Sequence, residues 1–261
     1  MNKETEATTV KLTPSIKAKR TSETAEEKHA RIGRLYNRPK PSNLWNGFAV
    51  EPAHGTWEQM KYFILSIICG NNREMFLYVM GWMAAMVQKP NSAGQIALFL
   101  NGAGGTGKSF FIQCLSNLMA ERASHVTDLK QVTGKFNGNL KDCVLLVVEG
   151  AFSAGNNRVE SVLKSLISEA SIAIVEKRKD VQFIPSKFHV VMTGNDDRAL
   201  GLDVLRRLCV LNVSDARQHD HEYFSDIAQE LANGGLSAML FDLQQYDLDG
   251  FDVRHVPQAQ G

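Results

Sequence analysis

The sequence has few cysteines and no long hydrophobic run. Its four cysteines are far apart, lack C-x-x-C spacing and lie in apolar stretches: Cys69, Cys114, Cys143 and Cys209. We therefore expect buried free thiols, with no disulfide or zinc site, as is typical of a reducing cytoplasm. No stretch reaches the roughly 18–20 apolar residues of a membrane span, and residues 1–20 are too polar for a signal peptide. The sequence predicts a cytoplasmic protein without a membrane partner.

An excess of charge of one sign is also missing, because 29 Lys and Arg face 28 Asp and Glu. The distribution is nevertheless uneven. Residues 1–40 carry ten basic and five acidic side chains, whereas the remainder is slightly acidic. This arm is poor in large apolar residues, which is typical of a disordered segment. Two interpretations stay open: the arm contacts nucleic-acid phosphates, or it is a solvated linker.

Hydrophobic periodicity divides the rest of the chain. Apolar residues predict a helix over 57–69 and a second, apolar nearly all round, over 73–87. Four strand-length apolar runs follow, at 96–100, 143–148, 188–192 and 208–213. Continuous runs of this length favour strands of a parallel sheet that helices cover on both faces. The predicted segments are a basic arm (1–40), an N-terminal helical subdomain (41–92), an α/β core (93–215) and a C-terminal helical segment (216–261).

The strongest single signal is a phosphate-binding loop. Residues 102–109 read GAGGTGKS, which matches G-x-x-x-x-G-K-[ST], and they lie between a predicted strand and a predicted helix. The residues expected to hold a nucleoside triphosphate are Gly102, Gly104, Gly105, Thr106, Gly107, Lys108 and Ser109. The glycines allow backbone N–H groups to surround a phosphate at the start of the helix. Lys108 should reach the β- and γ-phosphates, and Ser109 should bind Mg²⁺.

A second apolar strand ends in an acid, which is the arrangement of a Walker B element. The acid is Glu149, and the next residue, where a second carboxylate often polarises the attacking water, is Gly150. Two interpretations remain open. Glu149 is the metal-site acid and the base is absent, or Glu149 is the base and Val148 stands where the metal-site acid would be.

Three further features surround this pair. The strand run 188–192 leads into Asn195, whose amide could orient the attacking water. Arg206 and Arg207 could reach the γ-phosphate of a neighbouring subunit, or form surface ion pairs. Residues 171–184 alternate as a β-hairpin, with Lys177, Arg178 and Lys179 at its tip. Such a tip suits a phosphate backbone but would also suit a solvated turn. His219 and His221 have a spacing that does not suit a helical metal site, and we expect a polar helix start there.

The whole set resembles the core of a superfamily 3 helicase and, more closely, the primase-helicase proteins of phages and prophages. The resemblance extends from about Leu44 to Pro257. Besides the P-loop, Asn195 and the two arginines, it includes these stretches: NLWNGF at 43–48, WMA at 82–84, VQ at 87–88, GKFN at 134–137, AFSAG at 151–155, LK at 163–164, EK at 176–177 and GFDVR at 250–254.

The resemblance implies an AAA+-like α/β P-loop NTPase fold with a parallel-rich central sheet. It also implies a ring, usually a hexamer, that binds ATP and Mg²⁺ between subunits. Glu149 would be the Walker B acid, Asn195 the sensor, and Arg206 or Arg207 the finger from the neighbour. Lys177, Arg178 and Lys179 would line a channel and pull single-stranded DNA through it. The setting would be the cytoplasm of a bacterial host, with a primase or polymerase domain or protein as a further partner.

The sequence departs from that family pattern in two ways. Gly150 stands where the catalytic Glu is usual, so a nucleotide-dependent DNA-binding ring with weak or no hydrolysis is an alternative to a translocating helicase. Forty mainly polar residues are too few for an upstream primase domain, so priming is not predicted. A P-loop small-molecule kinase is disfavoured, because such kinases lack both the sensor and the basic hairpin.

Overall fold

A computed structural model describes residues 47–127, 132, 137–149, 157–194 and 201–257, with the backbone alone at 157–159. The chain divides into two units, Met1–Leu44 and Trp45–Gly261, and the second contains all the described residues. The predicted basic arm, residues 1–40, therefore lies outside the described residues and stays a prediction.

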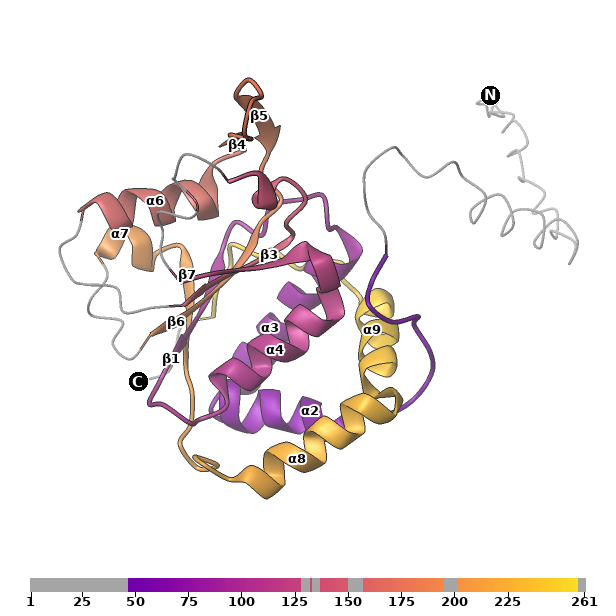
Figure 1. The fold of residues 1–261 in the computed structure, drawn as a ribbon. Helices are drawn as coiled ribbons and strands as arrows, with labels where there is room; N and C mark the ends of the chain where they lie inside the picture. The colour runs from indigo at the N-terminus through magenta and orange to yellow at the C-terminus, as the bar shows by residue number, and fades with distance from the viewer. Residues whose placement is uncertain (1–46, 128–131, 133–136, 150–156, 195–200, 258–261) are drawn as a thin grey trace, which may run out of the picture. The chain divides into compact units, whose positions relative to one another are not determined.

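A five-stranded parallel sheet forms the centre of the fold (Figure 1). The strands, in order across the sheet, are β2 (Ala123–Val126), β3 (Leu145–Glu149), β6 (His189–Gly194), β1 (Ala97–Asn101) and β7 (Leu208–Asn212). All four predicted strand runs are present, and β2 is an additional edge strand. The predicted fold class, an α/β fold with a parallel central sheet, is confirmed.

Both faces of the sheet are buried, as the continuous apolar runs predicted. Leu98 and Leu100 of β1 belong to one hydrophobic cluster, whereas Phe99 between them belongs to a second cluster. Residues alternate between the two faces of a strand, so each cluster occupies one face. The sheet is therefore the middle layer of three.

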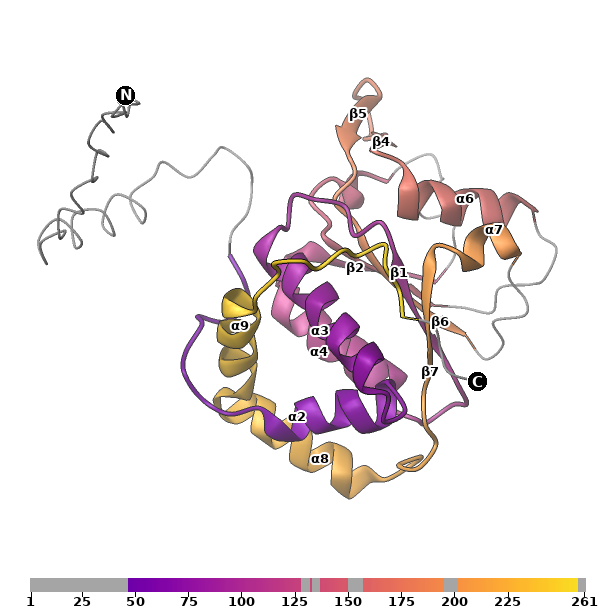
Figure 2. The same ribbon diagram turned by 180° about the vertical axis from the view of Figure 1, so that it is seen from behind.

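Five α-helices cover the face that carries Leu98 and Leu100 (Figures 1 and 2). They are α2 (Glu58–Phe63), α3 (Arg73–Gln88), α4 (Lys108–Met119), α8 (His221–Glu230) and α9 (Leu236–Gln245). Shorter turns accompany them: η1 (Ile64–Ile68), η2 (Ala120–Arg122) and η5 (Leu231–Gly235). The predicted helices 57–69 and 73–87 are present, and a π-helical turn completes the first.

The first and the last helices of the described chain belong to this one layer. The indole Nε1 of Trp57, just before α2, donates to Asp242 Oδ2 in α9 at 2.8 Å. The hydroxyl of Tyr78 in α3 donates to the carbonyl oxygen of Val253. A single apolar cluster joins these helices to the sheet. The boundaries predicted for two helical subdomains stay a prediction.

The opposite face carries α6 (Asn157–Ser168), α7 (Leu202–Leu205) and the hairpin of β4 (Ser171–Ile174) and β5 (Gln182–Pro185). A short turn, η3 (Gly138–Leu140), precedes β3. The hairpin is antiparallel, as the alternation predicted, with Ile172 opposite Ile184 and Ala173 opposite Phe183. Figures 1 and 2 show it extending beyond one end of the sheet.

All four cysteines are buried free thiols, as expected. Burial raises the pKa of the Cys114 thiol to about 12, so this group is protonated and unreactive at neutral pH. Within the ranges that the structure describes, no helix has the length and apolarity needed to cross a membrane.

Candidate nucleotide site and basic hairpin

The P-loop joins the carboxyl end of β1 to the amino end of α4. Gly105 and Gly107 have φ values of +78° and +96°, a conformation that side chains rarely adopt. A Cβ on Gly107 would lie 2.8 Å from the ring of Phe224, so the space is closed as well. Thr106 is buried and donates its hydroxyl to the Ala103 carbonyl at 2.9 Å. The loop conformation therefore requires the glycines that the sequence provides.

Lys108, the first residue of α4, folds back over this loop. Its ammonium donates to the carbonyl oxygens of Gly102 and Ala103, each at 2.6 Å. Partial burial lowers the pKa of this lysine from its usual value. Two carbonyls thus hold the cation beside the helix N-terminus, where it can exchange these contacts for phosphate oxygens. Ser109 is exposed in the first turn of α4.

Glu149 lies at the same edge of the sheet as the P-loop. It ends β3 and stands in register with Thr193 of β6, and β6 pairs on its other side with β1. One strand therefore separates Glu149 from Asn101, the residue before the loop, which is a spacing of roughly 10 Å between backbones. The carboxylate is half-buried. Gly150 and Asn195, which follow β3 and β6, lie outside the described residues.

The donor set fits a nucleoside triphosphate with a divalent cation. The loop presents backbone N–H groups and a lysine to phosphates, and the Ser109 hydroxyl and the Glu149 carboxylate are oxygen ligands of the kind that Mg²⁺ takes. No cluster of three or more His, Cys, Asp or Glu occurs within the described ranges.

Two residues that the sequence did not indicate as part of the site also contact the P-loop. The amide of Gln218 donates to the Gly104 carbonyl at 2.7 Å, and the backbone N–H of His219 donates to the Gly105 carbonyl at 3.1 Å. The His219 ring occupies the space in front of Gly105, 2.3 Å from where a Cβ would be. No local pattern in the sequence could have found these contacts, because more than a hundred residues separate the partners.

The helix start predicted at this segment is confirmed. The Asp220 side chain accepts a hydrogen bond from the backbone N–H of Tyr223 at 3.1 Å and caps α8. Gly234 breaks the helical path in η5, as expected for two helices separated at 233–235.

Arg206 and Arg207 lie at the opposite edge of the sheet, just before β7. Arg207 is fixed to its own chain, because Nε donates to Ser168 Oγ at 2.7 Å and the guanidinium also bonds the Asp203 carbonyl. Arg206 is 65% exposed and pairs with the Asp203 carboxylate at 3.3 Å. The structure does not bring either arginine to the P-loop of the same chain.

The hairpin tip carries less free positive charge than the sequence suggested. Glu176 binds Lys179 at 2.9 Å and lies 3.9 Å from Lys141, and the Lys179 hydrogen bond lowers the pKa of this carboxyl. In contrast, no carboxylate of the described residues pairs with Lys177 or Arg178. Arg178 has a φ of +65°, which shapes the tight turn. Lys177 and Arg178 are thus the available cations.

Comparisons with known proteins agree with this architecture. Residues 100–207 match a family of unknown function, DUF5906. Two apo structures of the NrS-1 C-terminal region match with TM-scores of 0.68 and 0.66 and identities of 20% and 19%, each over 85% of this chain. A crystal structure of JCV helicase with a bound thiazolopyridine acetamide matches with a TM-score of 0.46 and 14% identity, over 76% of this chain and 56% of that one. No curated protein matches.

The chain spans about half the length of the NrS-1 chains, 52% in both cases. The family match begins at Leu100, the residue before β1 ends, and includes the P-loop, Glu149 and the hairpin, and ends at Arg207. At these identities the structural likeness shows the fold, and it agrees with the parallel sheet and P-loop described above. The chain thus has an α/β P-loop fold similar to that of the NrS-1 C-terminal region.

Proposed function

We propose that this chain is an ATP-dependent translocase of single-stranded DNA, the helicase module of a phage or prophage replication protein. The observation that carries the proposal is the carboxyl edge of the sheet. There the P-loop with Lys108 and the strand that ends in Glu149 lie one strand apart. Such an edge can hold a triphosphate and its cation, with Ser109 and Glu149 on the metal side.

Assembly into a ring, with ATP between subunits, would explain why Arg206 and Arg207 lie far from the P-loop of their own chain. They precede β7, whereas the P-loop follows the carboxyl end of β1, and these two strands are parallel neighbours. A five-residue strand is roughly 16 Å long, so Arg206 is on the wrong side to reach its own nucleotide. On a neighbouring copy the exposed Arg206 would be the finger that neutralises the γ-phosphate. Arg207, fixed by Ser168, would hold the segment in place.

In the proposed ring the hairpins carry the DNA. Lys177 and Arg178 would contact backbone phosphates without reading sequence. Nucleotide turnover at the subunit interface would move the hairpins and the bound strand. A primase or polymerase would act as a partner, in the cytoplasm of a bacterial host.

A second candidate is a nucleotide-dependent DNA-binding ring with weak or absent hydrolysis. Gly150 directly after the strand-ending Glu149 favours it, because no second carboxylate follows in the sequence to polarise water. In this version ATP would favour assembly, and DNA would be held without net movement.

The deciding experiment measures ATP turnover with and without single-stranded DNA on the full chain, Lys108→Ala and Gly150→Glu, with particle mass recorded in parallel. The translocase predicts turnover that DNA stimulates and that Lys108→Ala removes. The second candidate predicts ATP-dependent assembly with no turnover above that of Lys108→Ala, and a gain of turnover in Gly150→Glu. Monomers under every nucleotide condition would overturn both.

A further inference from the structure

The outer face of the hairpin bears an exposed aromatic ring. Phe183 of β5 is 76% exposed, and Val181, two residues before it, is 53% exposed. These are two of the five large apolar side chains that stand out as exposed in the described ranges. Exposing a phenylalanine side chain to water is unfavourable. Val181 adds a second exposed apolar side chain two residues away, so the two form a small apolar patch.

The two faces of the hairpin differ in their surroundings. Ile174 is buried, and Ile172 and Ile184 pack against the core beneath the sheet. On the other face, Phe183 stands opposite Ala173, and Ser171 stands opposite Pro185. These three neighbours are small and exposed, so no side chain of the hairpin covers the ring.

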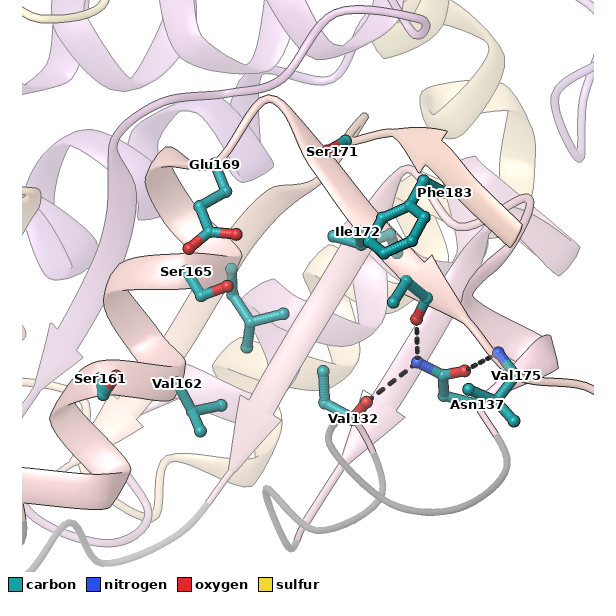
Figure 3. A pocket seen from close by; sticks show the side chains of 12 residues that line it. Val132, Asn137, Ser161, Val162, Ser165, Glu169, Ser171, Ile172, Val175 and Phe183 are labelled. Atoms are coloured by element: carbon teal, nitrogen blue, oxygen red, sulfur yellow. Dashed lines mark hydrogen bonds between the residues drawn. The ribbon is translucent and has the colours of Figure 1, made fainter. Parts of the chain in front are cut away.

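The hairpin is held rigidly enough to present that ring. The amide of Asn137 donates to the carbonyl oxygens of Ala173 and Val132, at 2.9 and 3.0 Å, and its oxygen accepts from the Val175 N–H at 2.8 Å (Figure 3). The backbone N–H of Asn137 adds a bond to the Val175 carbonyl at 3.1 Å. The buried Asn137 thus extends the ladder along the outer edge of β4, which braces the strand opposite Phe183.

Space for a flat group lies next to the ring. A pocket of about 480 Å³ separates the hairpin from α6. Its lining includes Ile172 and Phe183 of the hairpin and, from α6, Ser161, Val162 and Ser165 (Figure 3). The lining combines apolar side chains with hydroxyls and with the carboxylate of Glu169, the mixture of apolar and polar groups that ligand pockets have.

We infer that Phe183 is a stacking platform for the bases of single-stranded nucleic acid, alongside the phosphate contacts of the tip. Charge complementarity favours single-stranded nucleic acid as the molecule that covers Phe183. Lys177 and Arg178, only a few residues from Phe183 on the same hairpin, have no acidic partner among the described residues and attract a polyanion. A basic surface combined with an uncovered aromatic ring is how proteins bind single strands without reading sequence. The inference rests on the proposed function and adds to it a preference for unpaired bases.

Base stacking and phosphate contact have different salt dependences, which gives a sharp test. Fluorescence anisotropy would follow the binding of a labelled dT oligonucleotide to the full chain at several salt concentrations. Phe183→Ala should weaken binding about tenfold with the salt slope unchanged, because no ion pair is lost. Phe183→Trp should restore affinity, and dT should quench its fluorescence. Lys177→Ala should instead flatten the slope, by about 0.7 for a single strand.

An abasic oligonucleotide of the same length is the matched ligand control. Without bases it should bind the wild-type chain and Phe183→Ala equally. Tyr62→Ala is the matched protein control, because Tyr62 is an exposed aromatic, 59% exposed, on α2. This variant should bind dT as the wild-type chain does. Since the Phe183 ring is exposed, Phe183→Ala should keep the unfolding midpoint of the wild-type chain.

Three results would overturn the inference. One is unchanged dT binding by Phe183→Ala, and another is an equal loss on the abasic strand. The third is a loss of particle mass with binding per subunit unchanged, which would place Phe183 at a contact between copies. Failure of the proposed function looks different. In that case the wild-type chain does not bind dT at all, and Lys177→Ala changes nothing.

Discussion

The two edges of the sheet carry different chemistry. At the carboxyl edge the strands β1, β3 and β6 end beside glycines, a lysine and an acid, and Lys108 is held by backbone carbonyls. At the amino edge the chain places Arg206, Arg207 and the hairpin that leads into β6. We propose that the first edge receives a triphosphate. The second presents cations and an exposed ring but has no phosphate loop.

This separation explains how one chain can hold every element of the proposed machine and still be incomplete alone. The nucleotide edge and the arginine edge are at opposite ends of parallel strands, so in the proposed assembly they would meet between two copies. The hairpin is on the arginine edge too, and a movement of one copy relative to the next would therefore displace both. Variants at the nucleotide edge and at the arginine edge should therefore have different effects.

Lys108→Ala should remove ATP turnover entirely, because Lys108 is the P-loop cation expected to bind the β- and γ-phosphates. Affinity for single-stranded DNA without nucleotide should stay within about twofold, because the hairpin is on the other edge. Phosphate release and oligonucleotide anisotropy measure the two effects. A parallel loss of both would show that the edges are not independent.

Arg206→Ala should lower turnover about 10³-fold, the lower end of the range for an arginine finger. Its folding should be unaffected, since the side chain is mostly exposed and its ion pair with Asp203 is a surface one. Arg207→Ala is the informative companion. It should cost about 1 kcal/mol of stability through the lost bonds to Ser168 and Asp203. The division of roles fails if Arg207→Ala abolishes turnover while Arg206→Ala is active.

Acid should lower the free energy of unfolding through His189, at the amino edge of the sheet. Burial lowers the pKa of His189, at the start of β6, to about 4. The unfolded chain, with a usual value of 6.5, therefore binds this proton more readily. Stability is full above about pH 6.5 and falls as the pH drops toward 4, by on the order of 3 kcal/mol. Urea unfolding at pH 7.5 and 5 checks this, and His189→Gln should flatten the dependence. A flat profile in the wild-type chain would contradict it.

The smallest expected effect is a difference between Lys177 and Lys179, the two lysines of the hairpin tip, in the salt dependence of DNA binding. Lys177→Ala should lower the salt slope of oligonucleotide binding by about 0.7. Lys179→Ala should lower it by less than half as much, because Glu176 already neutralises Lys179. Glu176→Gln should strengthen binding. If Lys177→Ala and Lys179→Ala change the slope equally, the ion pair does not persist in solution.

Much of the fold could be predicted because its signals are local. Runs of apolar residues such as 143–148 identify strands buried on both faces, and the P-loop has a fixed spacing of glycines and lysine. The edge strand β2 had no such signal. Its residues include Ser124 and His125, and only Val126 is buried, so its pattern is that of a loop.

The residues of the candidate site stand out in the sequence, but their contacts do not. The sequence indicates Lys108 and Glu149, yet the single strand between them follows from the order of the sheet. The contact of His219 with Gly105 joins distant segments. The Glu176–Lys179 ion pair forms because the turn at the hairpin tip brings together two side chains that are three positions apart. Long-range packing determines the order of the strands and the contact of His219 with Gly105, and no short pattern in the sequence records it.

In the proposed assembly, the two edges of different copies form one active site. The most direct test mixes two inactive variants, Lys108→Ala and Arg206→Ala, and measures ATP turnover in the presence of single-stranded DNA. In a mixed assembly an intact P-loop from one variant meets an intact arginine from the other. We expect turnover to return in the mixture and to depend on the mixing ratio. A mixture that stays as inactive as its separate components would contradict it.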